Sequence, residues 1–153
     1  MKINHAGLAI IKQFEKCRLE AYMPTQDDVP TIGWGHTKGV NIGDVCTQEQ
    51  ADAWLVEDVG EAEDAVNEIN PLLTPNRFSA CVSLTFNIGV RAFRLSSLAK
   101  CLREGNYERA AGEFQKWNHQ GGLVLRGLTR RRWAEEELFR MPEPPQETEK
   151  LIA

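Results

Sequence analysis

The sequence lacks the features that mark several large classes of protein. No stretch approaches the eighteen uninterrupted apolar residues of a transmembrane helix, and the first residues have one lysine and only a brief apolar run, unlike a convincing signal peptide. The 4 cysteines and 3 histidines are scattered, without a Cys-x-x-Cys pair. This spacing favours reduced thiols over a zinc site or a disulfide framework. We therefore expect no metal and no stable membrane insertion.

An excess of either charge is also missing. The chain has 18 Lys and Arg against 22 Asp and Glu, a net charge of −4. A mildly acidic chain is a poor ligand for nucleic acid, and only the basic stretch at residues 126–132 favours a helical nucleic-acid binder as an alternative. The apolar share of 42% and charged share of 26% over 153 residues are typical of one compact domain or a small two-lobed one.

Helical patterns dominate, with a β-rich interruption near the N-terminus. An N-terminal helix is expected to about Tyr22, from apolar residues at helical spacing: Leu8, Ile11, Phe14 and Leu19. Residues 30–46 favour short strands and tight turns because four glycines lie among β-branched residues.

From residue 47 onward the sequence predicts helices. A Thr47-x-x-Gln50 capping box begins one that runs toward Ile69, and Thr74 before Pro75 begins another that ends near Gly89. Three more are expected at about residues 96–104, 107–117 and 122–141. Residues 142–153, rich in proline and polar side chains, are typical of a frayed tail.

Glu15 is the candidate for acid–base chemistry. It would emerge beside the apolar stripe of the first helix, partly shielded from water, which suits a proton donor; a plain surface glutamate is the alternative. Glu15 lies within FEKCRLEAY (residues 14–22), and a polar loop then leads to PTIGWGHT (residues 30–37). His36 in the second segment is expected to support the turn by hydrogen bonding rather than to bind a metal.

These two segments closely resemble phage lysozymes of glycoside hydrolase family 24. Later segments resemble blocks of the lambdoid branch, in the same order: PNRFSA (75–80), SLTFNIG (83–89) and GLVLRGLTRRR (122–132). The resemblance runs from about Leu8 to Phe139. It implies an α+β, mostly α, lysozyme-like fold in one domain over residues 1–153, with a small β-rich lobe (about 23–46), a larger helical lobe (about 47–141 plus the N-terminal helix) and a cleft between them.

The same resemblance implies an activity. The protein would be an endolysin that hydrolyses the β-1,4 bond between N-acetylmuramic acid and N-acetylglucosamine in peptidoglycan, with inversion and without a cofactor. Glu15 matches the general acid, and Thr31 matches the threonine whose hydroxyl helps to hold the attacking water. A monomer in the host cytoplasm, reaching the wall through a separate holin-type pore-forming protein, is also implied. Lytic transglycosylase cleavage to an anhydro product and a wall-binding module with weak catalysis are alternatives.

The second catalytic carboxylate departs from the family pattern. The family has an Asp, sometimes a Cys, nine residues after the glutamate and six before the threonine, but the loop here is one residue longer. Counting from either side gives Pro24 or Thr25. The nearest carboxylates are Asp27 and Asp28, which are also ordinary turn residues. Asp27 is preferred because Asp28 falls where the family has a turn glycine, and Asp28 and Thr25 remain alternatives.

Several other polar residues are candidates for substrate binding. Arg18 matches the family's arginine and would orient Glu15, and Asn87 matches a block near the cleft or simply caps the turn before Gly89. The three arginines at 130–132 cannot all face one way on a helix. Arg130 and Arg131 are the candidates to face the cleft, where they would pair with Glu15 or bind peptide carboxylates; salt bridges to Glu135, Glu136 and Glu137 are the alternative.

Overall fold

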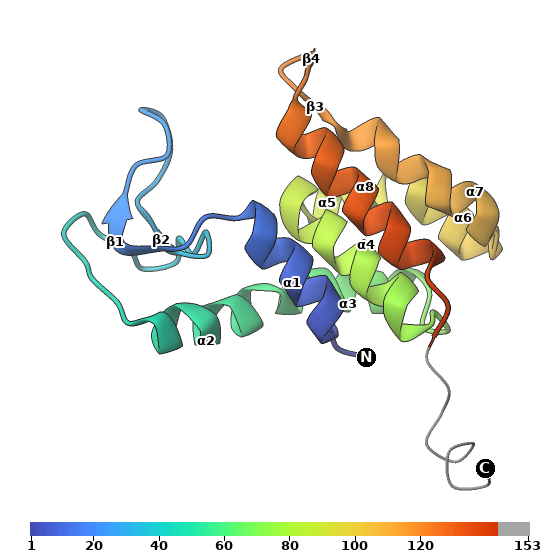
Figure 1. Cartoon of the computed structure of the whole chain (residues 1–153), viewed down its shortest axis with the longest axis horizontal. Helices are drawn as coiled ribbons and strands as arrows, with labels where there is room; N and C mark the ends of the chain where they lie inside the picture. Colours follow the sequence, from blue (N-terminus) through green and yellow to red (C-terminus); the bar gives the residue numbers. More distant parts are fainter. Residues whose placement is uncertain (144–153) are drawn as a thin grey trace, which may run out of the picture.

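The computed structural model describes residues 1–143, a helical body with a small β-rich region at one end (Figure 1). The elements in chain order are α1 (His5–Phe14), β1 (Arg18–Tyr22), β2 (Thr31–Gly33), α2 (Gln48–Asp58), α3 (Gly60–Ile69), α4 (Pro75–Ile88), α5 (Val90–Arg94), α6 (Ser97–Glu104), α7 (Tyr107–Glu113), the 3-10 helix η1 (Phe114–Trp117), β3 (His119–Gln120), β4 (Leu123–Val124) and α8 (Arg126–Arg140). This confirms the predicted α+β, mostly helical fold class. Among the helices of residues 1–143, none has the length and apolar character needed to cross a membrane. The predicted polar tail lies outside the described residues from residue 144 on.

The N-terminal helix is shorter than predicted. It ends at Phe14, and Glu15 is its C-cap with extended backbone angles (φ −91°, ψ 131°). The prediction of a helix to Tyr22 was wrong, because β1 pairs with β2 along one edge and bridges Val45 through Glu20 along the other. These non-local pairings outweigh a local helical spacing. Leu19, assigned to the apolar stripe, is instead 41% exposed.

The β region is fixed to α2 by aromatic and polar contacts. The indole Nε1 of Trp34 donates to Asp52 Oδ1 at 2.7 Å. His36 Nδ1 is hydrogen-bonded to Asp58 Oδ2 at 2.7 Å, and its ring stacks on Trp54 with centroids 4.4 Å apart. The expected hydrogen-bonding role of His36 is thus confirmed, and the turn that carries it is held against one helix.

Most of the predicted helix starts are confirmed, with three corrections. The side chains of Thr47, Thr74 and Ser96 cap α2, α4 and α6 as N-cap residues, and Gly105 ends α6 in the left-handed region (φ 70°). The expected helix from 47 to 69 breaks at Val59 into α2 and α3. The expected helix 107–117 tightens into η1, and the last helix begins at residue 126 rather than 122 because residues 119–124 form the β3–β4 hairpin.

Helix α4 lies at the centre of the helical body, beside α1 and α8 (Figure 1). Its buried face combines large apolar residues such as Phe78 with small ones such as Ser79. The small residues allow α1 to approach closely, since a Cβ added at Gly7 would lie 2.8 Å from Ser79 Cβ and 2.7 Å from a side-chain carbon of Ile3. The position of α1, and of Glu15 at its end, is therefore set by close packing on α4.

Candidate active site

Glu15 lies where α1 ends, between the β region and the helical body. Its side chain is 28% exposed. Its Oε1 accepts a hydrogen bond from Arg131 Nη1 at 2.9 Å. Its Oε2 faces the glycine turn of the β region, where a Cβ placed on Gly35 (φ 89°) would lie 3.9 Å away. One carboxylate oxygen is thus paired with a guanidinium, and the other faces a turn that carries no side chain at that point.

Arg131 is held in place by buried hydrogen bonds from α4 and α8. Its Nε donates to Glu135 Oε2 at 3.2 Å, and its Nη2 donates to the backbone oxygen of Ser83 at 3.2 Å. The hydroxyl of Ser83 donates to the same Glu135 oxygen at 2.5 Å. Because Arg131, Ser83 and Glu135 are all buried, this guanidinium has little freedom to leave Glu15.

Arg132 joins the same network from the other side. It pairs with Glu135 at 2.8 Å, and its Nη2 donates to Asn87 Oδ1 at 2.8 Å. Burial lowers the pKa of Arg132 to about 10, against the opposing pull of Glu135, so the side chain is still protonated at neutral pH. Burial raises the pKa of Glu135, and its ion pairs with Arg132 and Arg131 oppose that rise. Two guanidiniums face one buried carboxylate, and Glu15 supplies the second anion.

A groove opens beside this network. One pocket of about 310 Å³ includes Glu15 and Arg131 in its lining, together with Phe14, Asn87, Gln120, Leu125, Gly127 and Leu128. A neighbouring hollow of about 340 Å³ shares Asn87, Gln120 and Leu128 with it. Both hollows have a mixed polar and apolar lining and the size of a small-ligand site, and the pocket that includes Glu15 is called the groove below.

Thr31 lies on β2, four residues before Gly35, the residue of the glycine turn that Glu15 faces. It begins β2 opposite Tyr22 and is 6% exposed. Its hydroxyl donates to the backbone oxygen of Val29 at 3.0 Å, so that the lone pairs of Oγ1 remain available to accept another hydrogen bond. The next residue, Ile32, pairs with His36 around the glycine turn.

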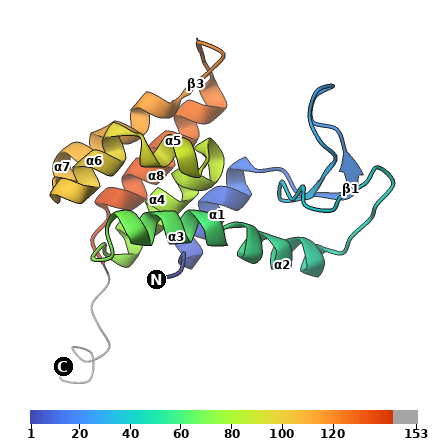
Figure 2. The same cartoon turned by 180° about the vertical axis from the view of Figure 1, so that it is seen from behind.

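The loop after β1 is exposed and loosely held. Thr25 Oγ1 donates to Asp28 Oδ2 at 2.9 Å, whereas Asp27 makes no hydrogen bond or ion pair with other residues of the described 1–143. Figures 1 and 2 show this loop rising on the same side of the molecule as the β3–β4 hairpin, with the end of α1 between them. Asp27 is therefore the candidate carboxylate with no competing partner in the described chain.

The remaining predicted binding residues divide into two groups. Arg131 and Asn87 line the groove with Glu15. Arg18 instead stacks over Tyr22, with its guanidinium carbon 4.6 Å from the ring centroid, and Arg130 is exposed. Within residues 1–143 the ion pair to Glu15 comes from Arg131 and not from Arg18.

The sequence reasoning missed the supporting role of Ser83 and the second arginine, Arg132. Pairing with Glu15 and salt bridges within the last helix were given as alternatives. Both are present, because Arg131 contacts Glu15 and Glu135 at the same time. The spacing of Arg131 and Arg132, four and three residues before Glu135, was the available signal. Ser83 offered no comparable signal.

A helix-terminal carboxylate held by a buried arginine, at the edge of a groove lined by α1, α4, α8 and the β3–β4 segment, fits a lysozyme-type hydrolase. The model of the family described as phage lysozyme matches residues 12–135. The chain belongs to the phage lysozyme family.

Relatives and a solved structure agree with this assignment. The endolysin of Acyrthosiphon pisum secondary endosymbiont phage 1 is 44% identical over 144 residues, which cover 91% of this chain and 98% of that protein. The endolysin of Bacillus phage PZA is 43% identical over 94% of this chain, and the chain spans 57% of its length. The solved muramidase domain of SpmX from Asticaccaulis excentricus has a TM-score of 0.86 at 39% identity, covering 92% of this chain and 99% of that one.

Proposed function

We propose that this endolysin is a muramidase that hydrolyses the β-1,4 bond between N-acetylmuramic acid and N-acetylglucosamine in peptidoglycan, with inversion at the anomeric carbon. The observation that carries the proposal is the position of Glu15, fixed at the edge of the groove by Arg131. The endolysin and muramidase names of the similar proteins support the same substrate.

In this proposal Glu15 is the proton donor. Its Oε2 faces the glycine turn, and Oε1 is occupied by Arg131, so the proton would reach the glycosidic oxygen from Oε2. The carboxylate left after transfer is stabilised by the guanidinium, which stays in place because Glu135 and the Ser83 backbone hold it. Arg131 thus stabilises the negative charge that develops on Glu15 as it gives up its proton.

The water would be oriented from the β region. Thr31 already donates its hydroxyl hydrogen to Val29, so its oxygen would accept a hydrogen bond from the water. Asp27 would supply the negative charge that assists deprotonation, because Asp28 is engaged by Thr25. Attack on the sugar face opposite the acid inverts the anomeric configuration.

Digestion of purified peptidoglycan tests this function. Hydrolysis predicts soluble fragments with a reducing N-acetylmuramic acid end, and NMR of the first product should show the inverted anomer. Fragments one water lighter would instead indicate transglycosylase cleavage to an anhydro product. Absence of soluble fragments, with retention on the wall, would leave only a wall-binding module.

We further propose the route to the substrate that the family resemblance implies. The protein accumulates as a monomer in the host cytoplasm and reaches the wall through a separate holin-type protein. Expression alone should be tolerated by cells, and coexpression with a pore-forming protein should lyse them. Lysis on expression alone would contradict the proposal, and sedimentation of the purified protein measures the oligomeric state.

A further inference from the structure

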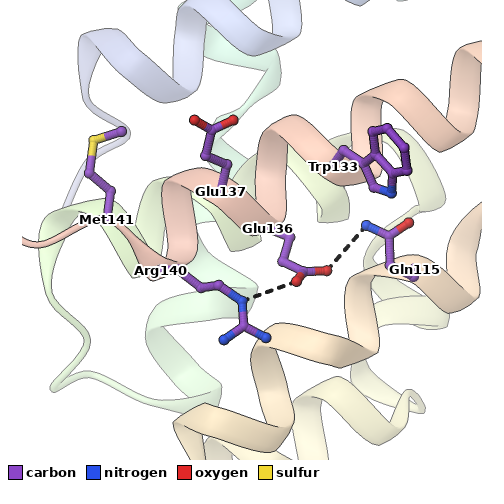
Figure 3. A pocket seen from close by; sticks show the side chains of 6 residues that line it. All are labelled: Gln115, Trp133, Glu136, Glu137, Arg140 and Met141. Atoms are coloured by element: carbon purple, nitrogen blue, oxygen red, sulfur yellow. Dashed lines mark hydrogen bonds and ion pairs between the residues drawn. The ribbon is translucent and has the colours of Figure 1, made fainter.

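A second pocket lies on the outer face of α8, away from Glu15. Its volume is about 560 Å³, and its lining comes from α8 and η1 with the residue that follows α8: Gln115, Trp133, Glu136, Glu137, Arg140 and Met141 (Figure 3). We propose that this pocket is an accessory glycan-binding site, in which the indole of Trp133 stacks on an N-acetylhexosamine ring of the peptidoglycan strand. The inference rests on the proposed function, which supplies the polymer.

Trp133 is exposed although its neighbours on the helix are buried. Its side chain is 64% exposed, and Arg131, Arg132 and Glu135 are buried in the network that holds Glu15. Two residues along a helix correspond to a rotation of about 200°, so Trp133 projects away from the groove that Arg131 lines. A large apolar side chain on the outer face of α8 contributes little to the core, and ligand contact gives it a role.

The polar groups beside the indole are already oriented. Gln115 Nε2 donates to Glu136 Oε1 at 3.2 Å, and Arg140 Nε donates to Glu136 Oε2 at 3.0 Å. Figure 3 shows the Gln115 amide next to the Trp133 ring, with Glu136 between Gln115 and Arg140. An amide, a carboxylate and a guanidinium around a flat apolar face can bind the hydroxyls and acetamide of a sugar while its C–H face covers the indole.

The chemistry of the pocket fits a sugar better than a protein or a charged polymer. Only Trp133 and Met141 are exposed large apolar residues there, too few for the roughly 800 Å² per partner that a stable protein interface buries. Arg140, the one cation among the described residues that line the pocket, is engaged by Glu136 and Glu108, which makes a polyanion a poor ligand. The amide, the guanidinium and the two carboxylates of the lining offer both donors and acceptors, which suit a hydroxyl-rich ligand.

Binding to purified peptidoglycan tests the site in the Glu15→Gln background, where the strand is not cleaved. Adding Trp133→Ala should weaken binding roughly threefold to tenfold, as loss of one aromatic contact does. Trp133→Phe should recover most of the affinity. Leu72→Ala, which removes a side chain that is 86% exposed elsewhere, is the matched control and should leave binding unchanged.

An NMR titration with the N-acetylglucosamine tetramer separates this pocket from the groove. The titration uses the Glu15→Gln variant so that the tetramer is not cleaved, and the indole N–H signal of Trp133, which lines this pocket and not the groove, should shift on addition of the tetramer. Unchanged wall affinity in Trp133→Ala together with an unmoved Trp133 signal would overturn the proposal. A dimer in sedimentation that Trp133→Ala dissociates would also overturn it and assign the surface to a second copy of the chain.

The wild-type digestion distinguishes this failure from failure of the proposed function. If the wild type releases reducing fragments and Trp133→Ala binds normally, only the accessory site fails. If the wild type releases none, the muramidase proposal fails, and the Trp133 signal still reports whether the tetramer binds.

Discussion

The helical body and the β region hold the two halves of the proposed site by different means. In the body, Arg131 is 3% exposed and has hydrogen bonds to Glu15, Glu135 and Ser83. In the β region, the loop with Asp27 is exposed, and its side-chain hydrogen bonds within residues 1–143 run from Thr25 to Asp28 and from Thr31 to the backbone oxygen of Val29. In the proposed mechanism, proton donation depends on a buried network, and the positioning of the water depends on an open loop.

This contrast is consistent with the expected departure from the family pattern, which falls in the loop and not around Glu15. A buried charged network tolerates little change, because removing one partner leaves another without compensation. An exposed loop on a rigid base accepts an extra residue at low cost. Trp34 and His36 provide that base by fixing the hairpin to α2.

The largest effect is expected at the end of α1. Glu15→Gln should reduce turnover of peptidoglycan by at least roughly 10²- to 10⁴-fold, because it removes the proton donor and keeps the shape. Thermal unfolding and wall binding should remain close to wild type. Glu20→Gln, an exposed carboxylate on β1, is the control, and near-normal turnover in Glu15→Gln would exclude Glu15 as the acid.

The buried network should dominate stability. Glu135→Gln should lower the free energy of unfolding by about 3–5 kcal/mol, because two buried guanidiniums lose their shared anion. Urea denaturation measures the loss. Glu104→Gln, an exposed carboxylate on α6, should change it by less than about 0.5 kcal/mol. A similar small change in Glu135→Gln would show that the network is not held by this charge.

The loop should separate a charge mechanism from a hydroxyl mechanism. If Asp27 assists the water by charge, Asp27→Ala should cost on the order of 10²-fold in turnover, and Asp28→Ala should cost less. If Thr25 acts through its hydroxyl, Thr25→Val should raise the barrier by about 1–2 kcal/mol, and both Asp variants should stay active. Lys38→Ala is the control in the same region. Full activity in all three variants would leave Thr31 alone as the water-positioning residue.

The smallest effect concerns the attachment of the β region to α2. The hydrogen bonds from Trp34 and Gln48 lower the pKa of Asp52 below its ordinary value. This lowered pKa stabilises the fold above the unfolded pKa of about 4, and the contribution is lost as the pH falls through the folded pKa.

Acid titration measures this attachment. The free energy of unfolding should therefore be larger for wild type than for Asp52→Asn above a pH of about 4, and this difference in free energy should decrease in more acidic solution. Asp64→Asn, on the exposed face of α3, should have the same free energy of unfolding as wild type over this pH range. NMR titration of the Asp52 carboxyl in Trp34→Phe should give a higher pKa than in wild type, and an unchanged value would remove the indole as the cause.

Short sequence patterns predicted most of the helix starts, whereas strand β1 depends on pairing with residues farther along the chain. The side-chain caps at Thr47, Thr74 and Ser96 depend on a few neighbouring residues only, so these helix starts were predictable. Strand β1 depends on partners at residues 31–33 and at Val45, and no local pattern reveals such partners. The β3–β4 hairpin was missed although its two-residue turn, Gly121-Gly122, is a local hairpin signal, and α5, with 5 residues, is too short to show a helical period.

The candidate site was predictable in part. Glu15 and Thr31 were predicted from the segments that resemble the family, and the structure places Glu15 beside Arg131 in the lining of the groove. Which of three consecutive arginines faces Glu15 depends on the rotation of α8 about its axis where it packs on α4 and α1, and the sequence of α8 alone does not give that rotation. The burial of Glu135 depends on how closely α8 packs on α4, a property of two distant segments together.

The close approach at Gly7 has a mechanical consequence for Glu15. The two residues are eight positions apart, about 12 Å along the helix axis. A small tilt of α1 about its contact with Ser79 therefore moves Glu15 by a larger distance than it moves Gly7. A methyl group at Gly7 would force α1 away from α4 and swing the carboxylate at the far end relative to Arg131. Misplacement by about 1 Å is enough to slow catalysis markedly. Gly7, which lines neither the groove nor the buried network, thus sets the position of the proposed proton donor relative to Arg131.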